Sequence, residues 1–106
     1  MSSHEINVIA ILTPLEGKFD AVVEAFTDLS QQVHANEPGT LIYYAVRPEG
    51  KSELVVVERY KNAEAAKVHR ESQNLQVFFE KTRPLLEIAP EIKRSSYVTG
   101  FERVEG

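Results

Sequence analysis

The sequence predicts an α+β domain of the ferredoxin-like type, in which a four-stranded antiparallel sheet carries its helices on one face. Segments rich in β-branched and aromatic residues alternate with helical stretches in the order β-α-β-β-α-β. The two middle strands are separated by residues 48–51, a PEGK turn that is typical of an antiparallel hairpin. With 106 residues, the chain is expected to form one domain over residues 1–106.

The first half of the chain divides into a strand, a long helix and a hairpin. Residues 4–13 are a β-branched run and predict the first strand. Residues 17–36 predict an amphipathic helix, because their apolar side chains recur at helical spacing. This apolar stripe contains Phe19, Val22, Val23, Phe26, Leu29 and Val33. Pro38 and Gly39 end the helix, because proline cannot continue it and glycine tolerates a tight exit.

The two hairpin strands are predicted at residues 40–47 and 52–61. Two short helices follow at residues 63–70 and 73–86, and the last strand is predicted at residues 91–104. Asn62 and Ser72 precede the two helices and are residue types that cap helix N-termini. Pro84 is expected to disturb the last turn of the second helix, because proline lacks a backbone donor. Gly100 indicates a bulge or a bend in the last strand.

Both faces of the predicted sheet are apolar. In the strand at residues 52–61, Leu54 and Val56 point to one face, and Val55 and Val57 point to the other. The helices of a βαββαβ unit cover only one face, so the other face needs a cover from outside the chain. We expect a second copy to supply it through a two-fold axis, which gives a homodimer through the sheet face.

Composition and motif content argue against several classes of function. A formal net charge of −4 without a basic run argues against nucleic-acid binding, which needs clustered cations. Because the chain has no cysteine, disulfides, thiolate nucleophiles and cysteine-held metals are excluded. The histidines have no HxH or HExxH spacing, so no metal site is expected. No membrane-length apolar run and no signal-like opening segment occur, so we expect a cytoplasmic protein.

The candidate chemistry lies at the end of the second hairpin strand and in the helix after it. Glu58 and Tyr60 leave the strand on one face, and His69 follows in the next helix. Each of them also has a structural interpretation: His69 can be a structural histidine bonded to Glu58 or to a backbone carbonyl, and Tyr60 can be pocket wall. Tyr43 and Tyr44 point to opposite faces, so that one can line a pocket while the other meets a dimer partner.

Three short motifs follow one another along the chain. They are Glu37-Pro38-Gly39 before a strand, Val55-Val56-Val57-Glu58-Arg59-Tyr60 within a strand, and Ala65-Ala66-Lys67-Val68-His69 with Ser72 soon after. In this order and spacing they resemble the antibiotic biosynthesis monooxygenase (ABM) family, whose members are dimeric α/β barrels. The resemblance extends over nearly the whole chain.

The resemblance implies a pocket between the helices and the covered face of the sheet that binds a small hydrophobic or aromatic compound. Some members oxygenate phenols without metal or flavin, because the deprotonated substrate itself passes an electron to oxygen. Histidine can take a phenolic proton, so His69 is the candidate base. Tyr60 is the second candidate catalytic residue, which orients a hydroxyl or stacks on a ring. The substrate-binding set is Asn7, Glu58, Tyr43, Phe78 and Phe79.

Two positions depart from the best-understood chemistries of the family. Val56 stands where quinone-forming members tend to have asparagine, and its side chain neither donates nor accepts a hydrogen bond. Phe79 is the nearest equivalent of the iron-binding histidine of haem-degrading relatives. Asn7 matches a polar position in those relatives, but without the histidine haem degradation is not expected.

The leading hypothesis is therefore a monooxygenase that needs no cofactor and acts on a small aromatic or quinol-like compound. A second hypothesis, from a different class, is a non-catalytic small-molecule-binding or stress-response dimer with an inert apolar pocket. A third is lyase or isomerase chemistry, which related dimeric barrels also support.

Overall fold

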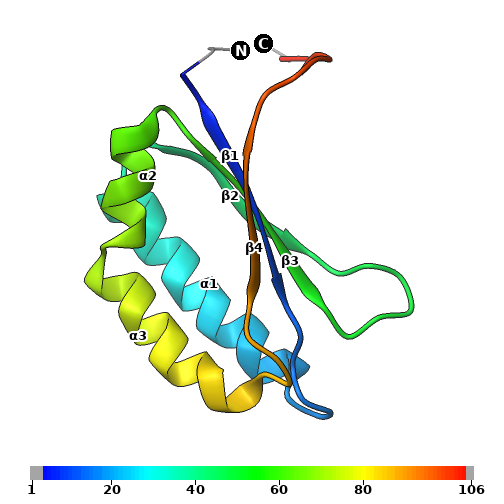
Figure 1. Ribbon diagram of the computed structural model, residues 1–106. Coiled ribbons are helices and arrows are strands. Elements are labelled where there is room, and N and C mark those ends of the chain that lie inside the picture. The colour runs from blue at the N-terminus through cyan, green and yellow to red at the C-terminus, as the bar shows by residue number, and fades with distance from the viewer. Residues whose placement is uncertain (1–3, 105–106) are drawn as a thin grey trace.

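The computed structural model describes residues 4–104. Its elements follow the predicted order (Figure 1): β1 (Ile6–Leu12), α1 (Phe19–Asn36), β2 (Thr40–Val46), β3 (Leu54–Tyr60), α2 (Ala63–Arg70), α3 (Gln73–Thr82), the 3₁₀ turn η1 (Arg83–Leu85) and β4 (Glu91–Ser96). The strands form one antiparallel sheet in the order β2-β3-β1-β4. The α-helices lie together on one face of this sheet (Figure 1), which confirms the ferredoxin-like prediction.

The core fills the space between α1, α3 and the covered face of the sheet. Its buried members are Ala10, Leu12, Val22, Phe26, Leu29, Val33, Leu54, Val56 and Phe78. The predicted apolar stripe of α1 supplies four of these side chains, which confirms the helical period read from the sequence. On β3, every second residue from Leu54 to Tyr60 is buried against the helices.

The strand register lines up side chains in rows across the sheet. Tyr43 of β2 pairs with Glu58 of β3, Glu58 pairs with Val8 of β1, and Val8 pairs with Arg94 of β4. These four residues therefore form one row on the face that the helices cover. Glu58 and Arg94 are two strands apart in this row, which places their Cα atoms about 10 Å from each other.

Caps and breakers delimit the second half of the chain as predicted. The Asn62 side chain accepts a hydrogen bond from the Ala65 backbone N–H at 2.9 Å, and Ser72 Oγ accepts one from the Leu75 N–H at 3.1 Å. The helix predicted over residues 73–86 ends early, at Thr82, because Pro84 cannot donate to an α-helical ladder; residues 83–85 form η1 instead.

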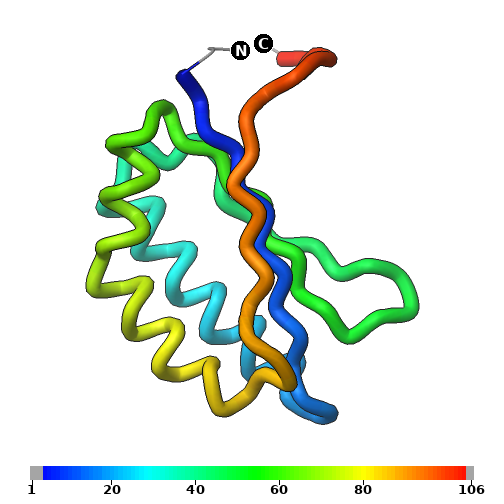
Figure 2. The backbone as a smooth tube through the Cα atoms, in the orientation of Figure 1, coloured from blue at the N-terminus to red at the C-terminus, as the bar shows by residue number. Residues whose placement is uncertain are grey.

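The last strand is shorter than predicted. It was expected to reach residue 104, but β4 ends at Ser96. The Tyr97 hydroxyl donates a hydrogen bond to the Gly100 carbonyl at 2.6 Å, and Gly100 has a φ of 124°. This local turn replaces strand pairing, because a positive φ interrupts the extended backbone. Figure 2 shows the segment after β4 running toward the end of the molecule where β1 begins.

The backbone approaches α2 closely at Gly39, the residue just before β2. A Cβ atom placed on Gly39 would lie 2.6 Å from the Cβ of Ala65. We therefore expect Gly39→Ala to lower the free energy of unfolding by about 1–3 kcal/mol through overpacking. Ala65→Gly in the same chain should recover most of that loss, although a glycine inside a helix itself costs about 1 kcal/mol.

Urea unfolding of the four proteins of this double-mutant cycle measures the coupling between the two positions. Strictly additive losses would contradict the close approach of β2 and α2. The cycle bears on the candidate site as well, because Glu37 and His69 lie on the two segments that meet here.

Candidate functional site

A cavity of about 340 Å³ lies between the sheet and the helices, within the size range of small-molecule sites. It is lined by Val8, Ala10, Leu12, Phe26, Tyr43, Val56, Glu58, Tyr60, Ala66, His69, Arg70, Leu75, Gln76, Phe78, Phe79, Pro90, Ile92 and Arg94. Most of these side chains are apolar or aromatic. The polar ones form a buried group on β3 and α2 and a second, exposed group on α2, α3 and β4.

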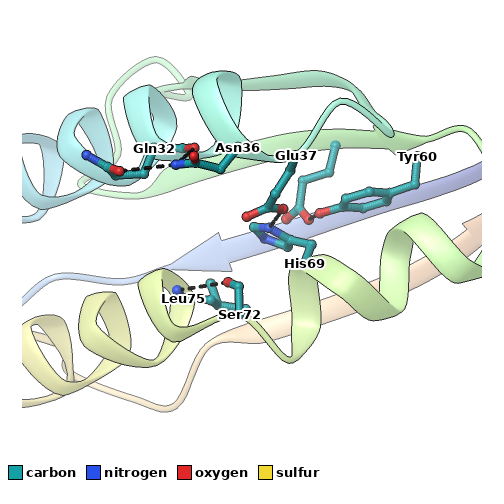
Figure 3. A network of polar contacts seen from close by, with 8 residues as sticks. Gln32, Asn36, Glu37, Tyr60, His69, Ser72 and Leu75 are labelled. Carbon is teal, nitrogen blue, oxygen red and sulfur yellow. Dashed lines mark hydrogen bonds and ion pairs between the residues drawn. The ribbon is translucent and has the colours of Figure 1, made fainter.

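The buried polar group contains a histidine–carboxylate pair (Figure 3). His69 Nδ1 lies 2.8 Å from Glu37 Oε1, and the two residues are only 5% and 6% exposed. Among residues 4–104, Nε2 of His69 has no hydrogen-bond partner. A neutral imidazole that donates its Nδ1–H to a carboxylate leaves the Nε2 lone pair free to accept a proton. Since His69 lines the cavity and Glu37 does not, Glu37 holds the ring from behind.

A second buried pair lies on β3, next to the first. The Tyr60 hydroxyl donates a hydrogen bond to Glu58 Oε1. Burial raises the pKa of Glu58, and this effect is partly opposed by the bond from Tyr60 and by the nearby His69. Burial, together with the charge of Glu58, raises the pKa of Tyr60. Tyr60 therefore remains a protonated donor at neutral pH.

Aromatic rings fix the orientation of His69. Tyr43 meets the imidazole edge-on with ring centres 5.1 Å apart, and Tyr60 lies 5.5 Å from it at a tilt of 34°. Phe26 in turn stacks on Tyr43, with ring centres 5.1 Å apart. Burial raises the pKa of Tyr43, so this ring also stays neutral. These ring contacts restrict the rotation of the His69 imidazole and hold it in one position.

The structure brings together most of the residues predicted for the site. The cavity is lined by His69, Tyr60, Glu58, Tyr43, Phe78 and Phe79, and also by Val56. Tyr44, by contrast, is exposed on the opposite face of the sheet, as expected for the neighbour of Tyr43 in a strand.

Asn7 is not among the residues that line the cavity. It alternates along β1 with the cavity-lining Val8, and in the sheet it pairs with Arg59. Since neighbouring residues of a strand point to opposite faces, Asn7 lies on the face away from the helices. Arg59 on that face binds Glu102 at 3.0 Å, within the same chain. The structure thus separates Asn7 from the other candidates.

Glu37 was not among the predicted site residues. From the sequence, Glu37-Pro38-Gly39 indicates a helix stop and part of a family motif, and the predicted partner of His69 is Glu58 or a backbone carbonyl. The structure gives Glu37 as that partner. The available signal was Gly39, because a glycine two residues after the carboxylate permits the close contact with α2. Arg70, Gln76 and Arg94, at the exposed side of the cavity, were missed as well.

Two further observations concern residues 4–104 alone. Nowhere in this range do three or more histidine, aspartate or glutamate side chains gather as a metal site would require. None of the helices there has both the length and the apolar character needed to cross a membrane.

Glu58 supplies a prediction about the pH dependence of stability. Its pKa is raised in the folded protein, so its contribution is most favourable below the ordinary carboxyl pKa and is lost as the pH rises through the folded value. We therefore expect Glu58→Gln, which keeps an acceptor for Tyr60 but cannot ionise, to gain stability relative to the unmodified protein between pH 4 and pH 8. Urea unfolding of both proteins at the two pH values measures this difference.

The matched control is Glu64→Gln, on the exposed side of the α2 N-terminus. The stability of Glu64→Gln relative to the unmodified protein should not rise between pH 4 and pH 8 as that of Glu58→Gln does. A Glu58→Gln variant that loses relative stability as the pH rises would contradict the raised pKa.

The fold and this cavity together define a class: a small α+β domain that encloses a mainly apolar cavity with a buried histidine–glutamate pair. The family model of the antibiotic biosynthesis monooxygenases matches residues 6–81. The chain belongs to this ABM family, as its motifs predicted.

Solved structures give the same result for the fold. The chain is 28% identical to a "putative antibiotic biosynthesis monooxygenase" from Caulobacter crescentus, with a TM-score of 0.86 and 92% of each chain covered. It is 20% identical to Rv0793 from Mycobacterium tuberculosis, with a TM-score of 0.85, covering 92% of this chain and 99% of that one. A Bacteroides thetaiotaomicron protein described as a possible oxidoreductase is 15% identical, with a TM-score of 0.80 and coverages of 91% and 100%. No curated protein matches the chain.

Proposed function

We propose that the protein is a monooxygenase that oxidises a small aromatic or quinol-like compound in the cavity beside His69, without a bound cofactor. The observation that carries the proposal is the buried His69, whose Nδ1 is held by Glu37 and whose Nε2 has no partner among the described residues. Membership of the ABM family supports the reaction class. The name of the Caulobacter relative points in the same direction.

The chemistry begins with a proton transfer. His69 Nε2 takes the hydroxyl proton of a phenolic substrate, and the phenolate passes one electron to O₂. The resulting substrate radical and superoxide combine, which forms a carbon–oxygen bond to the ring. The imidazolium returns its proton to the outer oxygen, the ring carbon loses its hydrogen as a proton, and the O–O bond breaks. The products are a quinone and one water, and the substrate supplies all four electrons that O₂ accepts.

In this proposal, the other buried groups position the substrate. Glu37 stabilises the imidazolium that forms on His69, because a carboxylate next to a cation favours the charged form. Glu58 Oε1 already accepts the Tyr60 hydroxyl proton, and the remaining oxygen atoms of this pair can accept a hydrogen bond from a substrate hydroxyl, a role that Val56 cannot fill. Phe78 and Phe79, which meet at 63° with centres 5.5 Å apart, supply ring surfaces against which the substrate packs.

The proposal includes a homodimer that forms through the bare face of the sheet. Tyr44 and Val46 point to that face and are 49% and 48% exposed in the single chain. Ile9, Ile11 and Val57 lie on the same face and are half-buried. A second copy packed against this surface would remove these apolar groups from water.

The direct test is an oxygen-consumption assay with a panel of naphthols and quinols, using protein freed of metals and flavins. With ¹⁸O₂, the quinone product should carry one labelled oxygen atom and the second atom should appear in water. Compounds that bind without consuming oxygen would favour the second hypothesis, an inert binding dimer. The mainly apolar lining of the cavity, which includes Val56, is also consistent with that hypothesis. Turnover without oxygen would favour lyase or isomerase chemistry, which the same base can serve.

A further inference from the structure

The exposed side of the cavity carries a charge that the proposed reaction does not use. Arg70 at the C-terminal end of α2 and Arg94 on β4 both line the cavity, and both are exposed. Neither guanidinium has a hydrogen-bond or ion-pair partner among residues 4–104. The amide of Gln76, from α3, lines the same side. In a chain with a formal net charge of −4, two unpaired arginines on the lining of one cavity are a local positive site.

The interior of the cavity does not neutralise this charge. The acidic side chain on the lining is Glu58, which accepts the hydrogen bond of Tyr60 and lies two strands away from Arg94. Glu37 lies behind His69 and off the lining. Glu91 of β4 is bound to Lys93 at 3.4 Å, and both residues alternate with Arg94 onto the other face of the sheet. The arginines therefore remain available to a ligand.

The sheet register sets the distance between the two polar groups of the cavity. Arg94, Val8 and Glu58 stand in one row, with the apolar Val8 between the two polar residues. Their outer members are about 10 Å apart at Cα. A ligand that reaches both must carry polar groups at opposite ends and an apolar ring system in the middle.

We propose that the natural ligand is an aromatic acid, with its carboxylate at Arg70 and Arg94 and its hydroxyl at the Glu58–Tyr60–His69 group. Guanidinium groups bind carboxylates through paired charge-assisted hydrogen bonds, which a neutral ring cannot form. The inference rests on the proposed function in placing the hydroxyl next to His69. It goes further by assigning an acid at the other end of the molecule and two residues that recognise it.

The test is a fluorescence titration with two matched probes, 6-hydroxynaphthalene-2-carboxylate and 2-naphthol. They share the ring and the hydroxyl, and only the first carries an acid at the opposite end. We expect the unmodified protein to bind the hydroxynaphthoate about tenfold more tightly than the naphthol, which is the effect of roughly one charge-assisted bond. Arg70→Gln with Arg94→Gln should abolish this preference and leave naphthol binding within about twofold of its original value.

Lys93→Gln is the matched control, because it removes the same charge one residue from Arg94 but on the other face of the sheet. It should keep the preference. The inference is overturned if the double arginine variant keeps the preference, if Lys93→Gln weakens hydroxynaphthoate binding as much as Arg94→Gln does, or if neither probe binds. The titration is run under nitrogen, so that a naphthol that is also a substrate is not turned over. A failed oxygen assay therefore counts against the proposed reaction and leaves arginine-dependent binding of the acid intact.

Discussion

His69→Ala is expected to lower the rate of oxygen consumption by about 100-fold or more, since a positioned general base contributes that much to a proton transfer. The imidazole is the cavity-lining group whose free nitrogen is set up to accept a phenolic proton. Initial rates with the best naphthol or quinol of the panel, measured with an oxygen electrode, give the effect. His34→Ala, which removes an exposed histidine in the last turn of α1, should retain full activity.

A graded variant separates catalysis from simple damage to the site. Glu37→Gln keeps an acceptor for the Nδ1–H of His69 but removes the negative charge, so we expect a loss of about tenfold, the equivalent of one charge-assisted contact. A Glu37→Gln variant with normal rates would show that Glu37 has no part in the reaction.

The second large effect concerns assembly. Tyr44→Asp should convert the proposed homodimer to a monomer at micromolar concentration, because the change would bury an unpaired carboxylate at the sheet-to-sheet contact. Tyr44 is 49% exposed in the single chain, so the isolated subunit should tolerate the change. Light scattering coupled to size-exclusion chromatography measures the mass directly.

Val68→Asp is the matched control for the dimer. Val68 is 50% exposed, but it lies on α2, away from the bare face of the sheet. This variant should remain dimeric. An unmodified protein that runs as a monomer at micromolar concentration would contradict the argument that the apolar bare face is covered by a second copy.

Periodic patterns predicted most of the fold, because they depend on local geometry. The stripe of α1 and the alternation on β3 follow from helical and strand periods, and both were found as predicted. The caps at Asn62 and Ser72 are also local interactions. The end of β4 was predicted wrongly: Gly100 indicated a bulge or a bend within a longer strand, but the Tyr97–Gly100 hydrogen bond forms a local turn and the strand ends before it, at Ser96.

The site was harder to predict, because it depends on contacts between segments far apart in sequence. Strand alternation on β3 was enough to predict that Glu58 and Tyr60 lie on the same face. The contact of Glu37 with His69 spans 32 residues and depends on the packing of α2 against the start of β2, which no local pattern predicts. Asn7 was assigned by family resemblance. Its register beside Arg59 instead places it across the sheet from the cavity.

The most direct test of the central claim is the protonation state of a phenol bound in the cavity without oxygen. The probe is 4-nitrophenol, whose phenolate absorbs at a longer wavelength than the phenol, titrated under nitrogen at a pH where the free dye is mainly protonated. If His69 is the base, the bound dye should show the phenolate band in the unmodified protein and the phenol band in His69→Ala, with binding retained in both. Bound dye with the same spectrum in the two proteins would contradict the account.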